Sequence, residues 1–480
     1  MPEPLAPAAP QNDSSALSSP RDAAAQLWEA VGLEAGAPER LDLIGADPAL
    51  PSSFAVGAAA QASIAAAGLA ATEIWRLRGG EAQRVAVDMR HAAAEFRSER
   101  YLRVGGETPP DPWDKIAGAY RCGDGKWIRL HTNFPHHRDG VLDLLGCSYD
   151  KEAVSAALRD WSALSFEQSA SERGLVVAAM RSFEEWDAHP QALALAQLPV
   201  ISIEKIGEAD PMPFAPGAQR PLDGVKVLDL TRIIAGPVCG RTLAAHGADV
   251  MLVSSPLLPF IPSLVIDTGR GKRSCYLHLT HEEGREGLDT LLGEADVFVQ
   301  GYRPGGLTEL GFGPEDCAAR RPGIVYVSLS AYGHTGPWAH KRGFDSLVQT
   351  ATGLNHAEMQ AAKDPKGVPR ALPAQALDHA AGYLMALGTM AALTRRAQEG
   401  GSWHVRVSLA QTGRWLRGLG RVPDGLAAPD PQREDVADLL EESESGFGLL
   451  SAVRHAAQLS ATPARWALPA VPLGEHPPRW

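Results

Sequence analysis

One acid, Asp378, begins an otherwise small and apolar stretch, ALPAQALDHAAGYLMALGTMAAL, at residues 371–393. Ala, Leu and Met favour helices, so the stretch predicts a helix with Asp378 in its first turn. A carboxylate there can accept backbone N–H bonds and oppose the positive end of the helix dipole. It can also act as a nucleophile that forms a covalent intermediate. The stretch alone favours the capping role, and a catalytic role needs support from elsewhere in the chain.

An internal repeat gives such support. Residues 62–93 resemble residues 382–413: each copy has a helix of small residues ending in basic residues, a GG turn and a V-x-V strand. On this alignment Asp378 lies opposite Gly57 or Ala58, so the N-terminal copy lacks the acid. A residue that only capped a helix would be expected in both copies. The difference therefore favours chemistry at Asp378.

Strand and helix patterns alternate through the second half of the chain. Helices are expected between the strands and over 282–295, and this alternation is typical of βαβ units in a mainly parallel sheet. The sequence therefore predicts an α/β fold with a Rossmann-like large domain. The expected strands lie at 226–230, 248–254, 273–279, 296–301 and 323–333.

The first half of the chain has a different pattern, which predicts a smaller α+β domain. Residues 118–133 favour a β-hairpin with GDG as its turn, and three helices are expected at 138–147, 152–161 and 165–181. A Pro- and Gly-rich stretch favours a linker between the two halves. The expected division is a disordered tail, a partial large-domain repeat without the acid, the small domain, the linker and the Rossmann-like domain, at 1–22, 23–110, 111–206, 207–223 and 224–480.

Composition excludes several classes of function. The net charge of −12 over 480 residues argues against a nucleic-acid partner, since phosphate binding needs a basic face. No membrane-spanning segment or signal peptide is expected. The five cysteines form no CxxC pair, which fits a reduced cytoplasmic location and argues against a metal site. The histidines of residues 131–140 match no metal-ligand spacing and are expected in a loop.

Several segments in the right order resemble the family III CoA-transferases, to which α-methylacyl-CoA racemase is related. Each segment alone is a weak signal, whereas all of them in this order are specific. The resemblance implies the family's CoA-binding fold, and its small domain is matched by the first half of this chain. The segments are PLDGVKVLDLTRIIAGPVCGRTLAAHGADV at 221–250, GKRSCYLHL at 271–279, ADVFVQGYRPGGLTELGFG at 295–313, VYVSLSAYGHTGP at 325–337 and PLGEH near the end.

The resemblance also implies roles for individual residues. Asp378 matches the family's catalytic nucleophile. The loop residues Ile234, Ala235 and Gly236 match its CoA-binding loop. Three cations, Lys272, Arg273 and Arg303, resemble its contacts to the CoA phosphates. The small neighbours of Asp378, at residues 380–382, are expected to let CoA and acyl groups approach.

The activity implied is transfer of CoA from an acyl-CoA donor to a carboxylic acid acceptor, through an aspartyl anhydride and an aspartyl-CoA thioester. Coenzyme A is then a substrate and carrier, and no metal or redox cofactor is expected. The family resemblance implies an interlocked homodimer, with sites between the large domain of one chain and the small domain of the other. In this chain the small domain comes first, a rearranged domain order that leaves open whether one chain supplies both parts. The chain departs from the family after its second strand, where LVSSPLLPFIPS replaces an acidic and basic pair, and at the turn EGGSW.

Two alternatives remain open. A racemase-like enzyme would need a histidine where Phe344 stands, and His379 points about 100° away from Asp378 on a helix. Proton abstraction is therefore disfavoured relative to acyl exchange. The other alternative is a CoA-binding subunit without catalysis, which the lost acidic and basic pair motivates. The identities of the acyl donor and acceptor are not evident from the sequence.

Overall fold

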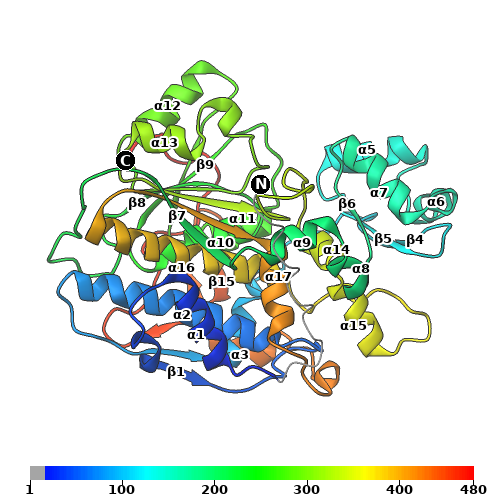
Figure 1. The fold of residues 1–480 in the computed structure, drawn as a ribbon, viewed down its shortest axis with the longest axis horizontal. Helices are drawn as coiled ribbons and strands as arrows, with labels where there is room; N and C mark the ends of the chain where they lie inside the picture. The colour runs from blue at the N-terminus through cyan, green and yellow to red at the C-terminus, as the bar shows by residue number, and fades with distance from the viewer. Residues whose placement is uncertain (1–16) are drawn as a thin grey trace, which may run out of the picture.

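The computed structural model describes residues 17–480 and is built around one seven-stranded sheet (Figure 1). All neighbouring strands pair in parallel except the last, which runs antiparallel to β13. The predicted α/β class with a mainly parallel sheet is therefore confirmed. The strand order is β10 (Lys272–Tyr276), β9 (Asp249–Ser254), β8 (Lys226–Leu230), β11 (Val297–Gln300), β12 (Val325–Ser330), β13 (Ser402–Ser408) and β7 (Ile201–Gly207).

Helices cover both faces of this sheet, which explains why its strands are almost continuously apolar. Along β11, Val297 and Val299 belong to the core shared with α16, while Phe298 belongs to the core beneath α12. Figure 1 shows the two layers on opposite sides of the sheet. One layer holds α10 (Ala235–Ala245) and α16 (Ala376–Glu399), backed by α2 (Val56–Leu77) and α1 (Pro20–Val31); the other holds α12 (Glu282–Leu292) and α13 (Pro314–Arg320).

The internal repeat appears as two similar units. The helix α2, the strand β2 (Val85–Asp88) and the helix α3 (Met89–Glu95) match α16, β13 and α17 (Leu409–Gly418). The long helices α2 and α16 pack against each other. The N-terminal copy thus extends the helical layer that carries Asp378.

The C-terminal segment pairs with strands from residues 41–104 in two small sheets. In one sheet β2 lies between β1 (Leu41–Ile44) and β16 (Gln458–Leu459), and in the other β15 (Leu450–Val453) lies between β14 (Leu440–Ser443) and β3 (Arg103–Val104). Strand β7, from the expected small domain, also joins the large sheet. Of the tail expected at 1–22, residues 1–16 lie outside the described residues. Helix α1 begins at Pro20, within the rest of it. The domain boundaries stay predictions. The strand pairing shows that segments from different expected domains share a sheet.

A separate three-stranded sheet forms the centre of the small domain. The predicted hairpin is confirmed as β4 (Gly118–Arg121) and β5 (Trp127–Leu130), and β6 (Val177–Ala179) pairs with β5. The prediction of one helix over 165–181 is wrong, because α7 ends at Glu172. Gly174 follows with φ +70°, and the β-branched residues after it extend into β6. The helices here are α5 (Pro135–Leu145), α6 (Lys151–Ala157) and α7 (Ala163–Glu172).

Short helices connect these parts. Helix α14 (Asp345–Ala351) packs against β5 and β6, so it joins the small domain to the segment before α16. None of the helices described is both long and apolar enough to cross a membrane. The short helices are α4 (Ser98–Tyr101), α8 (Phe183–Asp187), α9 (Pro190–Ala196), α11 (Pro262–Thr268), α14 (Asp345–Ala351) and α15 (Leu354–Ala362).

Candidate active site

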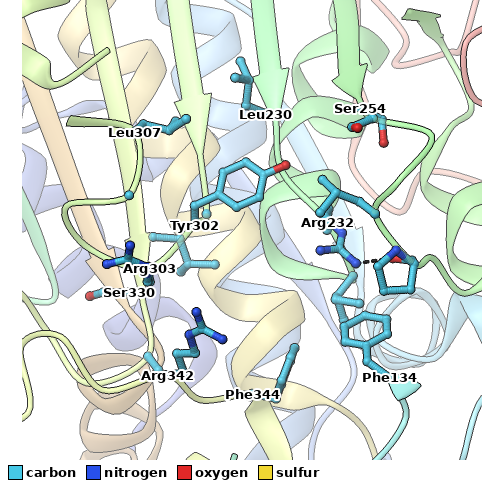
Figure 2. A pocket seen from close by; sticks show the side chains of 18 of the residues that line it. Phe134, Leu230, Arg232, Ser254, Tyr302, Arg303, Leu307, Ser330, Arg342 and Phe344 are labelled. Atoms are coloured by element: carbon cyan, nitrogen blue, oxygen red, sulfur yellow. Dashed lines mark hydrogen bonds between the residues drawn. The ribbon is translucent and has the colours of Figure 1, made fainter. Parts of the chain in front are cut away.

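A pocket of about 610 Å³ opens at the carboxyl ends of the parallel strands (Figure 2). Leu230 ends β8, Ser254 ends β9 and Ser330 ends β12, and all three line it. Ligands of open α/β sheets bind at this edge, because the loops that follow the strands converge there. The fold thus provides a cavity where the sequence placed its candidate loop.

Asp378 lines this pocket from the first turn of α16. Its backbone N–H donates to Asp345 Oδ2 at 3.0 Å, and the N–H of Leu377 donates to the same oxygen at 2.8 Å. Asp345 therefore caps the helix, although it lies 33 residues earlier in the chain. No residue in the described part of the chain donates a hydrogen bond to the Asp378 carboxylate. The capping role considered for Asp378 belongs to Asp345, and the Asp378 carboxylate stays available to a ligand.

The electrostatic surroundings disfavour charge on Asp378. Burial is the largest effect, and the nearby carboxylates of Asp345 and Glu99 add to it, so the pKa of Asp378 lies well above its usual range. Asp345 holds the charge of the pair more easily, because it accepts two backbone N–H bonds and one from Gln349. Asp378 is thus a basic carboxylate, and a basic carboxylate is the stronger nucleophile once ionised.

The loop after β8 forms one wall of the pocket, with Ile234 and Ala235 lining it. Ile233, immediately before, has φ 76°, a left-handed conformation that costs a β-branched residue about 1–3 kcal/mol. Gly236 lies behind the wall: a Cβ there would be 2.4 Å from the Cβ of Thr231. Two of the three predicted loop residues therefore face the pocket, and the third lets the loop pack closely.

Only one of the three predicted phosphate-binding cations reaches the pocket. Arg303 lines it and pairs with Glu309 at 2.9 Å. Lys272 is 2% exposed, and its Nζ lies 2.8 Å from both Asp229 Oδ2 and the Pro237 carbonyl oxygen. A buried lysine keeps its charge only beside such a partner, so Lys272 supports the loop from beneath.

Arg273 points elsewhere as well. Its guanidinium pairs with Asp249 and stacks over the ring of Trp480 at 5.5 Å. Neighbouring residues of a strand face opposite sides, so Lys272 and Arg273 diverge. The contact to CoA phosphates expected of these two residues is not supported by their positions.

The small domain of the same chain supplies the opposite wall, which was not predicted from the sequence. The interpretation of residues 131–140 as a loop is wrong beyond Phe134, because α5 starts at Pro135 and carries two histidines into the pocket. Proline at the first helical position was the signal that could have placed this helix. The wall residues are Phe134, His136, His137 and Val176.

Two further cations and an aromatic residue at the pocket were also missed. Arg232 follows Thr231 at the end of β8, Arg342 precedes Phe344, and Tyr302 adjoins Arg303. Figure 2 shows Arg232 and Arg342 entering the pocket from opposite sides of the view. Arg232 was recognisable by its place after a strand, whereas the long loop before α14 gave no such signal for Arg342.

The candidate proton-transfer residues lie differently from a racemase pair. His379 is buried outside the pocket, with Nε2 at 3.2 Å from Glu99 Oε2 and its ring stacked on Phe96. Phe344 lines the pocket, and its ring stacks on His131 with centroids 4.0 Å apart. Neither of these two residues thus places a base in the pocket beside the Asp378 carboxylate.

No cluster of three or more His, Cys, Asp or Glu side chains suited to a metal ion occurs within residues 17–480. The five cysteines are all free thiols.

Comparison with known proteins defines the class. The model of CoA-transferase family III matches residues 222–436, which include Asp378 and most of the pocket. An acyl-CoA transferase of Gibberella moniliformis is 30% identical over 75% of this chain and 70% of its own length. The chain therefore belongs to the family III CoA-transferases.

Two other similar proteins match over shorter stretches. Succinyl-CoA:glutarate CoA-transferase of Mus musculus is 34% identical over 38% of this chain and 44% of its own length. The crystal structure of Rv3272 from Mycobacterium tuberculosis is 33% identical, covers 41% of this chain and 57% of that protein, and superposes with a TM-score of 0.38. These matches span about half the length of each relative.

Proposed function

We propose that this protein moves CoA from an acyl-CoA donor to a carboxylic acid, with Asp378 as the nucleophile. One observation carries the proposal: among the residues of 17–480 that line the pocket, Asp378 is the only carboxylate. It is 6% exposed and lines the cavity, and family membership supports CoA transfer as the reaction class. The expected homodimer and cytoplasmic location remain predictions.

The reaction begins when the Asp378 carboxylate attacks the thioester carbonyl. The C–S bond breaks, CoA thiolate leaves and a mixed anhydride forms. The thiolate then attacks the aspartyl carbonyl and expels the donor acid as a carboxylate, which leaves an aspartyl-CoA thioester. The acceptor carboxylate attacks this thioester, and the released thiolate attacks the acceptor's acyl carbonyl. Acyl-CoA and the Asp378 carboxylate result, with no net proton transfer.

The environment of Asp378 fits these steps. A carboxylate with a raised pKa attacks well, and its charge disappears when it is acylated, which relieves the repulsion from Asp345 and Glu99. The N–H groups of Leu377 and Asp378 are already bonded to Asp345, so they are not free to stabilise an oxyanion. Stabilisation of developing charge is therefore assigned to pocket side chains rather than to the helix end.

Replacing Asp378 tests the proposal. Asp378→Ala removes the only group that can carry the acyl and CoA intermediates, so CoA exchange across a panel of acyl-CoA donors and acids should fall by at least about a thousandfold. Mass spectrometry of the CoA products measures the exchange. Full exchange activity in the variant would refute the role of Asp378.

A second candidate, a racemase-like α-proton enzyme, is motivated by His136 and His137 in the same pocket. Burial and nearby cations lower the pKa of His137 to about 4, which makes it a weak base at neutral pH. Incorporation of deuterium at the α-carbon of a 2-methylacyl-CoA, without any acceptor acid, would favour this candidate over CoA transfer.

A further inference from the structure

Two polar contacts join one face of α16 to the N-terminal copy of the repeat. Tyr383 Oη donates to Glu95 Oε1 at 2.5 Å. Four residues earlier on α16, His379 Nε2 lies 3.2 Å from Glu99 Oε2, and the two acids are also four residues apart. The ring of Phe96 stacks on those of His379 and Tyr383, with ring centres 5.4 Å and 6.2 Å away. These five residues form a contact ladder between α16 and the segment that holds α3 and α4.

The contact ladder is buried and firmly held. Tyr383 is 0% exposed and His379 is 1% exposed. Glu95 Oε2 accepts the backbone N–H of Ala456 at 2.6 Å, and Glu95 Oε1 lies 3.8 Å from Arg241 Nη2. A buried carboxylate is tolerated only with such partners. Glu95 is therefore tied both to the C-terminal segment and to α10, and it gives the contact ladder a fixed base.

The contact ladder belongs to only one copy of the repeat. In each copy a capping carboxylate accepts two consecutive backbone N–H bonds, the second from Ala58 in α2 and from Asp378 in α16. On this register α2 has Ala59 and Ser63 where α16 has its histidine and tyrosine. The nucleophile and the two side chains that α16 contributes to the contact ladder thus occur together, and the other copy has none of them.

The first turn of α16 is held by two separate elements. Asp345, at the start of α14, accepts the backbone N–H of Asp378, while the contact ladder holds the side chain of the next residue, His379. Successive side chains on a helix point about 100° apart, so the contact ladder can fix the rotation of α16 while Asp378 faces the pocket. None of the five residues of the contact ladder lines that pocket. A small rotation of α16 would move the Asp378 carboxylate across it.

We propose that the contact ladder positions Asp378 for attack, so that the N-terminal copy of the repeat serves as a positioning element of the active site. This inference rests on the proposed role of Asp378 in CoA transfer. Attack on a thioester requires the carboxylate oxygen about 3–3.5 Å from the carbonyl carbon and correctly aligned, and a misplacement of about 1 Å costs roughly a hundredfold in rate. The residues of the contact ladder act through the helix and do not touch the substrate, so they are positioning residues.

Glu99 contributes both a hydrogen-bond acceptor and a charge. The charged or titratable groups that face it are His379 and Asp378 on α16, Arg100 on its own helix and Asp267 on α11. Its charge adds to burial and the capping carboxylate in raising the pKa of Asp378. Glutamine at this position separates the two effects, because the amide oxygen still accepts from the histidine while the charge is gone.

Single-turnover formation of the aspartyl-CoA thioester from an acyl-CoA donor, followed by mass spectrometry, tests the proposal. His379→Phe keeps a ring on Phe96 and removes the contact to Glu99. At saturating donor, and at a pH where the rate has levelled off, its rate should fall by about tenfold to a hundredfold. The donor concentration for half-maximal rate should stay within about twofold, because the pocket lining is unchanged. Tyr383→Phe, which removes one hydroxyl, should lower the rate in the same way but less.

Tyr326→Phe is the matched control for the loss of a buried hydroxyl. Tyr326 Oη donates to the Phe312 carbonyl oxygen at 2.9 Å, in the core beneath α12 and on the other face of the sheet. Its melting temperature should fall, as in Tyr383→Phe, with no change in rate. Glu99→Gln should keep the plateau rate near that of the wild-type protein and move the acid limb to lower pH, whereas Glu99→Ala should lose plateau rate.

The outcomes separate the positioning role from the proposed function. If His379→Phe and Tyr383→Phe lower only the melting temperature, as the control does, the contact ladder merely supports the fold and the proposal is overturned. A loss confined to donor affinity would also overturn it, because the contact ladder would then act on binding. If the wild-type protein forms no thioester with any donor, the CoA-transferase function itself fails, and the positioning role falls with it.

Discussion

Two carboxylates have different roles at the start of α16. Asp345 accepts the backbone N–H bonds of Leu377 and Asp378, and this leaves the Asp378 carboxylate facing the pocket. The same arrangement raises the pKa of Asp378, because burial and then the Asp345 charge oppose its ionisation. The N-terminal repeat has the capping acid but lacks the acid that faces the pocket. Asp47 accepts from the N–H groups of Gly57 and Ala58, and neither of these two residues is acidic.

The pH dependence of thioester formation should report this arrangement. Attack needs ionised Asp378, so the rate should rise with pH through the raised pKa and then level off. Asp345→Asn removes a negative neighbour, which favours ionisation, so the acid limb should move to lower pH. Single-turnover kinetics across pH would measure the shift.

Asp47→Asn is the matched control for this variant. It removes an equivalent cap, which should cost about 1 kcal/mol of stability, and Asp47 does not line the pocket. Its pH profile should match that of the wild-type protein. An acid limb that stays in place, or moves to higher pH, in Asp345→Asn would contradict the account of Asp378.

At the scale of elements, the small residues after Asp378 serve helix packing more than ligand access. Ala380 and Ala381 are buried, and a Cβ on Gly382 would lie 2.6 Å from the Ala235 carbonyl oxygen and 2.7 Å from Val238 Cβ. From the sequence, these residues were expected to let CoA approach Asp378. Instead they let α16 approach α10, so that Asp378 and the loop after β8 meet at one pocket.

Gly382→Ala should therefore separate the two helices near the pocket. Overpacking of this kind costs about 1–3 kcal/mol, so the melting temperature should fall. The value of kcat should fall as well, because Asp378 moves relative to Ala235. Gly36→Ala, where a Cβ meets nothing within 4 Å, is the control and should behave as the wild-type protein does. An unchanged melting temperature and kcat in Gly382→Ala would show that this contact is unimportant.

At the scale of the whole molecule, one chain supplies both walls of the pocket. Phe134 comes from the small domain, Asp378 from the large sheet's helical layer, and both line the same cavity. The family resemblance implied an interlocked dimer, in which the two walls would come from different chains. The geometry favours a site that one chain completes.

Complementation between variants tests this arrangement. Phe134→Ala and Asp378→Ala should each be defective, and chains co-expressed from both genes should show no more activity than the average of the separate variants. Each chain would then contain one damaged wall, whatever its assembly state. Recovery of substantial activity in the mixture would mean that walls from two chains combine.

The sequence predicted the parts of the fold that depend on local pattern. The strands of the parallel sheet and the position of Asp378 in a first helical turn follow from apolar runs and helix-forming residues. Lys272 and Arg273 were misplaced because a charge on a strand is indistinguishable, in sequence, from a charge at a ligand site. Their partners Asp229 and Asp249 are distant in the chain and become neighbours only through the sheet.

The pocket wall that the small domain forms could not be predicted from the sequence, for a related reason. His137 and Phe134 reach the pocket through packing of one domain on another, and no periodicity encodes that contact. Likewise, the capping role of Asp345 could not be predicted from the sequence, since its bond to the Asp378 N–H spans 33 residues.

The most direct test of the central claim is the chemical state of Asp378 during turnover. The protein should be incubated with an acyl-CoA donor, treated with hydroxylamine, digested and analysed by mass spectrometry. We expect a hydroxamate on Asp378 and none on Asp345 or Glu99, with loss of activity in proportion to labelling. An active enzyme whose Asp378 peptide stays unmodified under these conditions would contradict it.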